Sequence, residues 1–296
     1  MKISYSMRQS FKSCPRRVYW KYYCGIERKS FDSPSRVIGS GYHLGLETMR
    51  RTGDMDLAFM TMKEFVLNSD FNWLRDIDKE ENIAKLEAYL TGYENKFFDL
   101  NHKWMDVEKE IMTEFETAYV DGLMIDEDGK IVVVEDKTRS YLTNNIDLVL
   151  RQSDQLLNYL TLLQQIGIDS NTCYYREVQK TKSKIGKTMS MDAYKAKLFG
   201  EYSLGDRYQE CIITFDKNEI EAYKNEKSLI DIVINICFES GDINQWPRNS
   251  DSCIGNYGQC DFLRLCSSKN YYTDYKANEK DPYDDGLMRK KIGVTE

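Results

Sequence analysis

The stretch from Ile125 to Thr138 reads IDEDGKIVVVEDKT and consists of an acidic turn, four apolar residues and three consecutive charges. The apolar run is typical of a strand built for burial, with polar residues on both sides. Alternate side chains of a strand point to opposite faces, so Glu135 and Lys137 share one face while Asp136 lies on the other. The sequence therefore places a carboxylate and an ammonium group side by side at the end of a buried strand.

A second carboxylate falls beside this pair if the acidic turn is a hairpin loop. With a loop from Asp126 to Lys130, Ile125 pairs with Ile131 and Asp121 stands opposite Glu135. Two carboxylates and a lysine are equipped to hold a divalent cation and to hydrolyse a phosphodiester bond, because the cation activates water and the ammonium group stabilises developing charge. A salt bridge at a strand end explains the same residues equally well.

The acidic turn also resembles a Ca²⁺-binding loop. The pattern fits at every position except the first, where an acidic ligand is required and Met124 stands. The flanking residues are typical of strands, whereas such loops connect helices. A calcium-binding or purely structural metal protein is therefore an alternative with a clear objection against it.

The composition is that of a water-soluble chain. Its 296 residues are 41% hydrophobic and 30% charged, which is enough for one large or two small domains. No apolar run is long enough to cross a bilayer, and the first residues, MKISYSMRQSFKSC, lack the apolar stretch of a secretory signal. We expect a cytoplasmic protein without a membrane partner. The net charge of -7 argues against non-specific coating of nucleic acid.

The periodicity of apolar residues predicts helices and strands in an alternating order, which indicates an α/β domain with a mixed sheet. Strands are expected between Val107 and Lys137. The other expected elements are helices at Gly39–Val66, Asp78–Met105, Ile146–Ile166 and Lys217–Glu239, and strands at Thr172–Val178 and Tyr208–Phe215.

The N-terminal segment is basic and rich in aromatic residues. Such a helix suits a phosphate backbone with stackable bases, although an amphipathic helix with core aromatics and solvated charges explains the same pattern. A second basic run, QKTKSKIGKT from Gln179 to Thr188, is typical of a loop that faces phosphates. The candidate DNA-binding residues of the N-terminal segment are Arg8, Lys12, Arg16, Arg17 and Lys21.

Five short motifs occur in an order that resembles the RecB-like nucleases of the PD-(D/E)XK superfamily. They are SYSMRQSFKSCPRRVYWKYY at the start, GSGYH at Gly39 to His43, VDG at Val120 to Gly122, VVEDKT at Val133 to Thr138 and QLLNY at Gln155 to Tyr159. The resemblance runs from about Ser4 to Cys266. It implies a restriction-endonuclease-like α/β core, a mixed central sheet flanked by helices, a helical insertion and a cysteine cluster at the joined termini.

The same resemblance implies one nuclease domain over residues 1–296. Within it we expect a helical region at 44–106, a catalytic core at 107–240, a C-terminal cysteine cluster at 246–268 and a loosely held tail at 270–296. The chain ends would meet at the cysteine cluster.

For the site, the resemblance implies that His43 and Asp121 are metal ligands, with Mg²⁺ or Mn²⁺ as the ion. It implies that Glu135 is the bridging acidic ligand and Lys137 the catalytic lysine. Gln155 and Tyr159 lie one turn apart on a helix and would help to position DNA or the metal ligands. Without the resemblance, His43 is an ordinary helix histidine.

The C-terminal cysteines are clustered. Cys253, Cys260 and Cys266 fall within fourteen residues, and thiols gathered in a loop point to soft-metal ligation. Together with Cys14 they are similar to the cysteines of the iron–sulfur members of the superfamily, the AddB nucleases and the CRISPR adaptation nucleases, which implies a 4Fe-4S cluster. Cys253 departs from the tighter spacing of those relatives, and four thiolates also suit Zn²⁺.

The sequence thus predicts a metal-dependent DNA nuclease, an exonuclease acting on single strands or DNA ends in recombination or repair. A different class of function stays open, namely a DNA-binding or assembly subunit of a recombination or CRISPR adaptation complex that does not cut. Because the sequence has no phosphate-binding loop for ATP, unwinding would need a helicase partner.

Overall fold

The computed structural model describes residues 2–28, 34–68, 76–97, 103–255, 258–267 and 275–277. The chain divides into two compact units. The sheet unit comprises Phe31–Thr113 and Thr117–Ile220, and the terminal unit comprises Met1–Ser30, Glu114–Glu116 and Glu221–Glu296. The expected α/β class, with a mixed central sheet flanked by helices, is confirmed.

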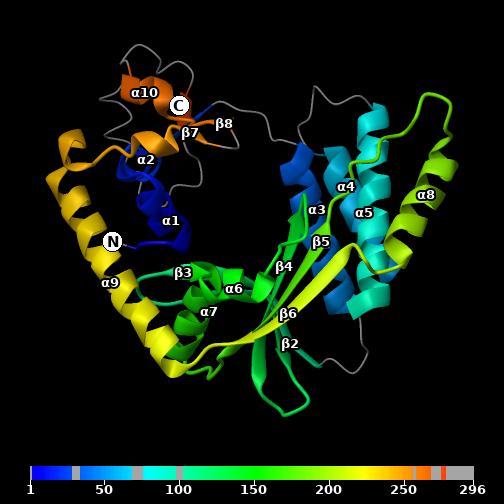
Figure 1. Ribbon diagram of the computed structural model, residues 1–296, viewed down its shortest axis with the longest axis horizontal. Helices are drawn as coiled ribbons and strands as arrows, with labels where there is room; N and C mark the ends of the chain where they lie inside the picture. The colour runs from blue at the N-terminus through cyan, green and yellow to red at the C-terminus, as the bar shows by residue number, and fades with distance from the viewer. Residues whose placement is uncertain are drawn as a thin grey trace. The chain divides into compact units, whose positions relative to one another are not determined.

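The sheet unit is built on five strands in the order β2-β3-β4-β5-β6 (Figure 1). β4 and β5 run parallel, and the other neighbours are antiparallel. The hairpin between β3 and β4 has the predicted register, since Ile125 pairs with Ile131. Gly129 provides the positive φ of its turn. The strands are β2 (Lys103–Met112), β3 (Thr117–Ile125), β4 (Ile131–Arg139), β5 (Thr172–Gln179) and β6 (Tyr208–Thr214).

Helices cover both faces of this sheet (Figure 1). One face carries α3 (Pro34–Thr52), α4 (Met55–Asn68), α5 (Asp76–Phe97) and α8 (Met191–Ser203). These helices share a large apolar core that includes buried tyrosines such as Tyr42, Tyr89 and Tyr202. The parallel pair β4–β5 is connected through α6 (Ile146–Arg151) and α7 (Asp154–Gln165) on the other face.

Two segments that were expected to be single helices are each broken by a local cap. The segment Gly39–Val66, expected to be one helix, is divided between α3 and α4. Helix α3 ends before Gly53, which has φ 69°. The side chain of Asp54 then accepts the N–H of Leu57 at 2.9 Å and begins α4. The expected helix Ile146–Ile166 is interrupted at Ser153, whose hydroxyl accepts the N–H of Leu156 in the first turn of α7. Capping side chains therefore override continuous apolar periodicity at both places.

Two further expectations differ from the structure. The expected helix Asp78–Met105 ends at Phe97, and strand β2 already begins at Lys103. Helix α8 was not predicted, although Ser190 caps it and it buries one residue per turn on one face, at Tyr194, Leu198 and Tyr202. That i, i+4 spacing was the signal for a helix that packs on α5.

The terminal unit brings residues from both ends of the chain together. β1 (Ile26–Arg28) pairs antiparallel with β9 (Tyr275–Ala277), and Trp246 is fully buried in a core that also contains Trp20 and Phe262. Helix α9 (Lys217–Ser240) starts in the sheet unit and enters this core. The other elements are α1 (Tyr5–Ser13), α2 (Pro15–Val18), the π-helical turn Tyr19–Tyr23, the 3₁₀ turns Ile243–Gln245 and Ser250–Ser252, β7 (Ile254–Gly255), β8 (Gly258–Gln259) and α10 (Leu263–Ser267).

Two sequence expectations concern the ends and the surroundings of the chain. The tail expected to be loosely held, 270–296, lies outside the described residues except for β9. Across the described ranges, no helix combines the length and the apolar character needed to cross a membrane.

Candidate active site

Three neighbouring strands of the sheet unit bring an acidic residue to the same level. Val107 pairs with Gly122 in β2 and β3, so the next residue, Glu108, stands opposite Asp121. The register of β3 and β4, continued by one residue beyond its last pair, sets Asp121 opposite Glu135. The predicted juxtaposition of Asp121 and Glu135 is therefore part of a longer acidic row across the sheet.

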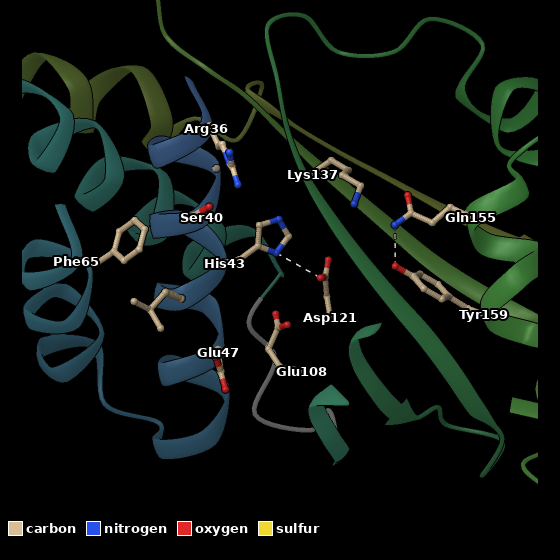
Figure 2. A pocket seen from close by; sticks show the side chains of 12 residues that line it. Arg36, Ser40, His43, Glu47, Phe65, Glu108, Asp121, Lys137, Gln155 and Tyr159 are labelled. Atoms are coloured by element: carbon tan, nitrogen blue, oxygen red, sulfur yellow. Dashed lines mark hydrogen bonds and ion pairs between the residues drawn. The ribbon is translucent and has the colours of Figure 1, made fainter. Parts of the chain in front are cut away.

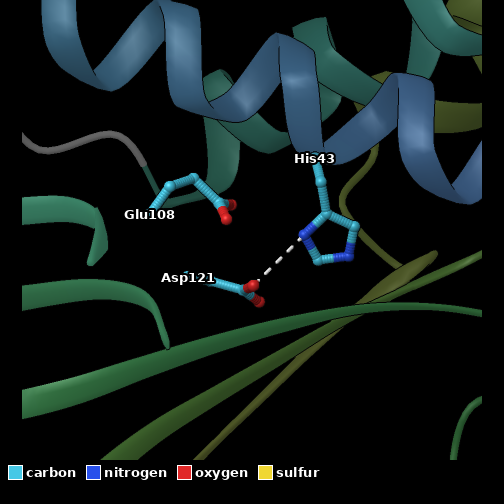
Figure 3. A group of neighbouring side chains, drawn as sticks. All are labelled: His43, Glu108 and Asp121. Carbon is cyan, nitrogen blue, oxygen red and sulfur yellow. Dashed lines mark ion pairs between the residues drawn. The ribbon is translucent and has the colours of Figure 1, made fainter. Parts of the chain in front are cut away.

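Asp121 links this row to helix α3. Its Oδ2 accepts the backbone N–H of Asp136 at 2.7 Å, and its Oδ1 lies 3.4 Å from His43 Nδ1 (Figure 3). Ligand atoms of His43, Glu108 and Asp121 all lie within 4.8 Å of one another, and they form the one such group of His, Cys, Asp and Glu within the described ranges. Oxygen donors with one imidazole nitrogen are a donor set that a small divalent cation accepts.

Glu108 is the member of this group that the sequence analysis did not select. Its φ of 49° lies in the left-handed region, and β2 also has a register shift between Trp104 and Asp106. A non-glycine residue there costs about 1–2 kcal/mol, and such strain is concentrated at functional sites. The Glu108 carboxylate points toward His43 and Asp121 (Figure 3).

Glu135 is buried on β4 beside Lys137, whose side chain is partly exposed. The Lys137 Nζ is in ion-pair contact with Glu135 Oε1, and the Glu135 side chain is 1% exposed. No well-aligned hydrogen bond from a described residue reaches either Glu135 oxygen. Burial, followed by the charge of Asp121, raises the pKa of Glu135 to about 7. A buried carboxylate in this condition has capacity for a cation.

The pKa values of the other charged groups in the site are shifted by burial and by one another. Burial alone lowers the pKa of His43, but attraction to Asp121 outweighs it and the net shift is upward. Burial raises the pKa of Asp121, but the attraction to His43 and Lys137 lowers it by more, so the net shift is downward. Burial, followed by repulsion from Asp121, raises the pKa of Glu108 to about 7. The site therefore confines more negative charge than its own cations balance.

These side chains surround one cavity of about 730 Å³ in the sheet unit (Figure 2). His43 enters it from α3, and Lys137 faces it from β4. Gln155 and Tyr159 enter from α7, where the Gln155 amide donates to the Tyr159 hydroxyl at 2.7 Å. The structure thus brings together all six residues that the sequence analysis assigned to catalysis and the divalent metal, with Glu135 buried beside Lys137.

A buried arginine holds the helix that carries His43 to the strands that carry the acids. Arg50 of α3 donates to the carboxylate of Asp136 at 2.5 Å and to the carbonyl of Asp121 at 3.4 Å. Its guanidinium also lies 4.5 Å from the Trp104 ring centre. Asp136 faces away from the cavity, as strand alternation predicts, and this opposite face is used to anchor the site.

The basic N-terminal residues occupy other positions than expected. Arg8 is 3% exposed, and its guanidinium binds Glu116 at 2.9 Å and Asp231 at 2.6 Å inside the terminal unit. Arg16 donates to the backbone carbonyls of Trp246 and Ile243. The two guanidinium groups therefore bind carboxylates and carbonyls of the protein itself, and Arg8 and Arg16 are not among the proposed DNA contacts.

The remaining basic residues of this segment are closer to the surface. Lys12 pairs with Glu226 at 2.6 Å, and Lys21 lies 5.2 Å from the ring centre of Tyr22. The aromatic residues Tyr19, Trp20 and Tyr22 are buried in the core of the terminal unit. Of the two interpretations of this segment, the structure agrees with the amphipathic one for the aromatics.

The predicted cysteine cluster lies in the terminal unit. Cys14 Sγ accepts the N–H of Asn249 at 3.5 Å, and Cys266 Sγ accepts the indole N–H of Trp20 at 3.3 Å. Burial raises the pKa of the Cys260 and Cys266 thiols, and the nearby Cys14 adds a smaller upward effect on both. Among the described residues, no three of the four thiols lie within 4.8 Å of one another. Cys253 joins them through its carbonyl, which accepts the N–H of Cys260 at 2.8 Å.

Comparisons with known proteins place the chain in a family. Among solved structures, a phage-related exonuclease from Haemophilus somnus 129PT aligns with 15% identity and a TM-score of 0.36, over 69% of this chain and 95% of that chain. A search of curated proteins finds no match. A family model described as the PD-(D/E)XK nuclease superfamily matches residues 2–267. The chain therefore belongs to the PD-(D/E)XK nuclease superfamily.

Proposed function

We propose that this nuclease is a divalent-metal-dependent deoxyribonuclease that hydrolyses phosphodiester bonds in single-stranded DNA or at DNA ends. One observation carries the proposal: ligand atoms of His43, Glu108 and Asp121 converge within 4.8 Å in the cavity that Lys137 faces. An arrangement of cation ligands next to an ammonium group is suited to phosphate chemistry.

The donor groups fit a hard divalent cation such as Mg²⁺ or Mn²⁺. His43, Glu108, Asp121 and Glu135 would hold it, because they offer carboxylate oxygens and one imidazole nitrogen and because Glu135 is buried without an aligned hydrogen bond. When bound, the ion supplies activation of water at neutral pH and neutralises charge on the phosphate. Asp121 keeps His43 oriented through the contact between its Oδ1 and His43 Nδ1.

The remaining side chains of the cavity have separate tasks. Burial lowers the pKa of Lys137, but Glu135 and Asp121 raise it more, so the ammonium group stays charged and stabilises negative charge that develops on the phosphate oxygens. Burial and the nearby carboxylates raise the pKa of Tyr159. Its hydroxyl, held by Gln155, therefore remains a neutral donor that positions the substrate strand.

Exonuclease action and membership of the RecB-like branch rest on the order of the sequence motifs. We propose that both compact units belong to one nuclease domain, since the family model spans residues of both. Lys12, Arg17 and Lys21 stay the proposed DNA contacts of the terminal unit. A helicase, recombination or CRISPR adaptation protein is the proposed partner, and the cytoplasm, where the eight free cysteines would stay reduced, is the proposed location.

The alternative function is a DNA-binding or assembly subunit that does not cut. The presence of His43, Asp121 and Lys137 around one cavity, with Glu135 buried beside Lys137, favours cutting, because a subunit without catalysis has no need of a buried carboxylate held at a raised pKa. The strain at Glu108 favours it for the same reason.

Metal dependence is tested by digesting end-labelled single- and double-stranded DNA. Cutting is expected with Mg²⁺ or Mn²⁺, and a chelator should abolish it because the acidic row then lacks its cation. Release of labelled mononucleotides would support exonuclease action, whereas internal fragments would show endonuclease action. DNA binding without any cutting by folded, metal-supplied protein would support the assembly subunit instead.

We also propose that Cys14, Cys253, Cys260 and Cys266 hold a 4Fe-4S cluster, with structural Zn²⁺ as the alternative. Cys14 lies near Cys260 and Cys266, which come from the other end of the terminal unit, and this supports ligation of one metal centre by both ends. Burial raises the net pKa of Cys260 and Cys266, and the nearby Arg17 and Arg16 offset part of that increase, so a bound metal would have to draw the protons from these thiols.

Anaerobically purified protein is expected to contain iron and acid-labile sulfide and to absorb visible light. Cys260→Ser should remove most of the iron and lower the thermal stability of the protein, because the ligand set is incomplete. Cys211→Ser, in the sheet unit, is the matched control and should retain both. Zinc in place of iron would select the alternative, and protein without either metal would contradict both versions.

A further inference from the structure

The chain between β5 and α8 is an extended segment that is anchored at every second residue (Figure 1). Glu201 of α8 accepts the hydroxyl of Thr181 at 3.1 Å and the hydroxyl of Ser183 at 3.0 Å. The backbone N–H groups of Thr181 and Ile185 donate to a tyrosine hydroxyl and a carboxylate of α5, at 2.9 and 3.3 Å. The odd-numbered residues therefore fix the segment to the helices.

Between these anchors, the lysines at positions 182 and 184 face the solvent. Lys182 and Lys184 are exposed, as is Lys187 one turn further on. In an extended chain, residues two apart are separated by about 6.6 Å, so these ammonium groups form a spaced row. Lys195 and Lys197 of α8 each pair with a glutamate, whereas no carboxylate of the described residues lies within ion-pair distance of the three lysines in the row.

This row begins beside the active site. The backbone N–H of Lys180 donates to the carbonyl of Arg139 at 2.7 Å, which extends the pairing of β4 and β5. Arg139 follows Lys137 by two residues and shares its face of β4. Burial and the positive charge of Arg139 lower the pKa of Lys180, and Glu177 is 3.7 Å from the Arg139 guanidinium on its other side. Lys180 and Arg139 repel each other, and an anion bound between them would relieve that repulsion.

An exposed aromatic ring lies in the same place. Tyr141, in the loop after β4, is 65% exposed. Lys182 donates to the Tyr141 hydroxyl, and its Nζ lies 4.1 Å from the centre of the ring. A ring that is fixed beside a row of cations is what proteins use to stack a base while the phosphates are bound.

We propose that Arg139, Tyr141, Lys180 and the row of Lys182, Lys184 and Lys187 form a track for one strand of a nucleic acid that runs to the cavity at Lys137. The phosphates contact the cations, and a base stacks on Tyr141. The proposal lies wholly within the sheet unit, and it rests on the proposed function for the identity of the anion. A nucleic acid fits better than an acidic protein, because the row continues directly from the active-site strand and includes an aromatic ring.

The track is tested by the salt dependence of DNA binding. The triple variant Lys182→Ala, Lys184→Ala and Lys187→Ala is compared with Lys96→Ala, Lys130→Ala and Lys217→Ala, which removes the same charge from exposed lysines elsewhere in the sheet unit. Fluorescence anisotropy of a labelled single-stranded oligodeoxynucleotide is measured in chelator, so that nothing is cut. Each lost phosphate contact should lower the slope of log K against log salt by about 0.7, or about 2 for the row.

A slope difference of about 2 corresponds to roughly a hundredfold weaker binding at 0.1 M salt, extrapolated from 1 M. The control triple variant should bind like the wild type. Tyr141→Ala should weaken binding about five- to a hundredfold with little change of slope, and Tyr141→Phe should restore most of it, since stacking needs only the ring.

Equal slopes and affinities for the two triple variants would overturn the proposal and assign the row to another anionic partner. This failure is distinct from failure of the proposed function. A wild type that cuts DNA while the row variant binds normally would refute the track alone, and a wild type that binds along the track without cutting would refute the nuclease chemistry alone.

Discussion

Lys137→Ala is expected to slow DNA cutting by about a thousandfold while metal binding changes little. The Lys137 ammonium group faces the cavity and is held against Glu135, and its net pKa is raised by Glu135 and Asp121 against the effect of burial. A fixed donor aimed at developing charge contributes about 10² to 10³ in rate. Because Lys137 carries no lone pair while protonated, it is not a metal ligand, and Mn²⁺ affinity should stay within a few-fold.

The measurement is single-turnover cutting of end-labelled DNA together with calorimetric titration of Mn²⁺. Lys130→Ala is the matched control, since this exposed lysine lies in the turn that precedes β4 and should leave both quantities unchanged. Normal cutting by Lys137→Ala would exclude the assigned role. Loss of Mn²⁺ binding along with cutting would show that Lys137 acts by organising the carboxylates instead.

Glu135→Gln is expected to stabilise the metal-free protein at pH 8 and to abolish metal-dependent cutting. Glu135 has an ordinary pKa of 4.5 when unfolded and about 7 in the fold, where burial and Asp121 disfavour its charged form. The folded state is therefore favoured fully below about pH 4.5 and loses this stability as the pH rises through 7, by up to about 3 kcal/mol. Glutamine keeps the shape and removes the charge.

The gain should be about 2 kcal/mol at pH 8, since loss of the Lys137 contact offsets part of it, and near zero at pH 5. Urea unfolding in chelator at the two pH values measures it, with Glu127→Gln in the exposed turn as the control. Destabilisation at pH 8 would mean that the Glu135–Lys137 pair stabilises the metal-free fold. Glu135 would then be a residue that stabilises the metal-free fold, rather than one that destabilises it and is balanced by a bound cation.

The part of the site that could be predicted from the sequence is the part that one hairpin determines. The loop from Asp126 to Lys130 and the alternation along β4 are local, and they were sufficient to set Asp121 beside Glu135 and Lys137. The same reasoning on the hairpin of β2 and β3 would have set Glu108 opposite Asp121. Glu108 lies within the expected strand region from Val107, but its left-handed backbone has no glycine to mark it in the sequence.

The role of Arg8 could not be predicted, because its partners are distant in the chain. Asp231 lies 223 residues away, and Glu116 lies 108 residues away. The sequence pattern of a basic helix is the same whether its charged side chains bind phosphates or buried carboxylates, so only the structure distinguishes the two. The break of the helix at Gly53, in contrast, was local, and its glycine and following aspartate are ordinary stop and start signals.

The pairing of β1 with β9 has a consequence for synthesis on the ribosome. Apart from the short segment Glu114–Glu116, the sheet unit is continuous from Phe31 to Ile220 and can fold as it emerges. Residues 1–30 cannot complete their packing until α9 and β9 have been synthesised, and both follow most or all of the sheet unit in the chain. At about 5–20 residues per second, synthesis of residues 31–274, which precede β9, takes roughly 12 to 50 s. During that interval Trp20 and Tyr22 have none of their C-terminal neighbours, so the nascent N-terminal segment is a natural client for chaperones.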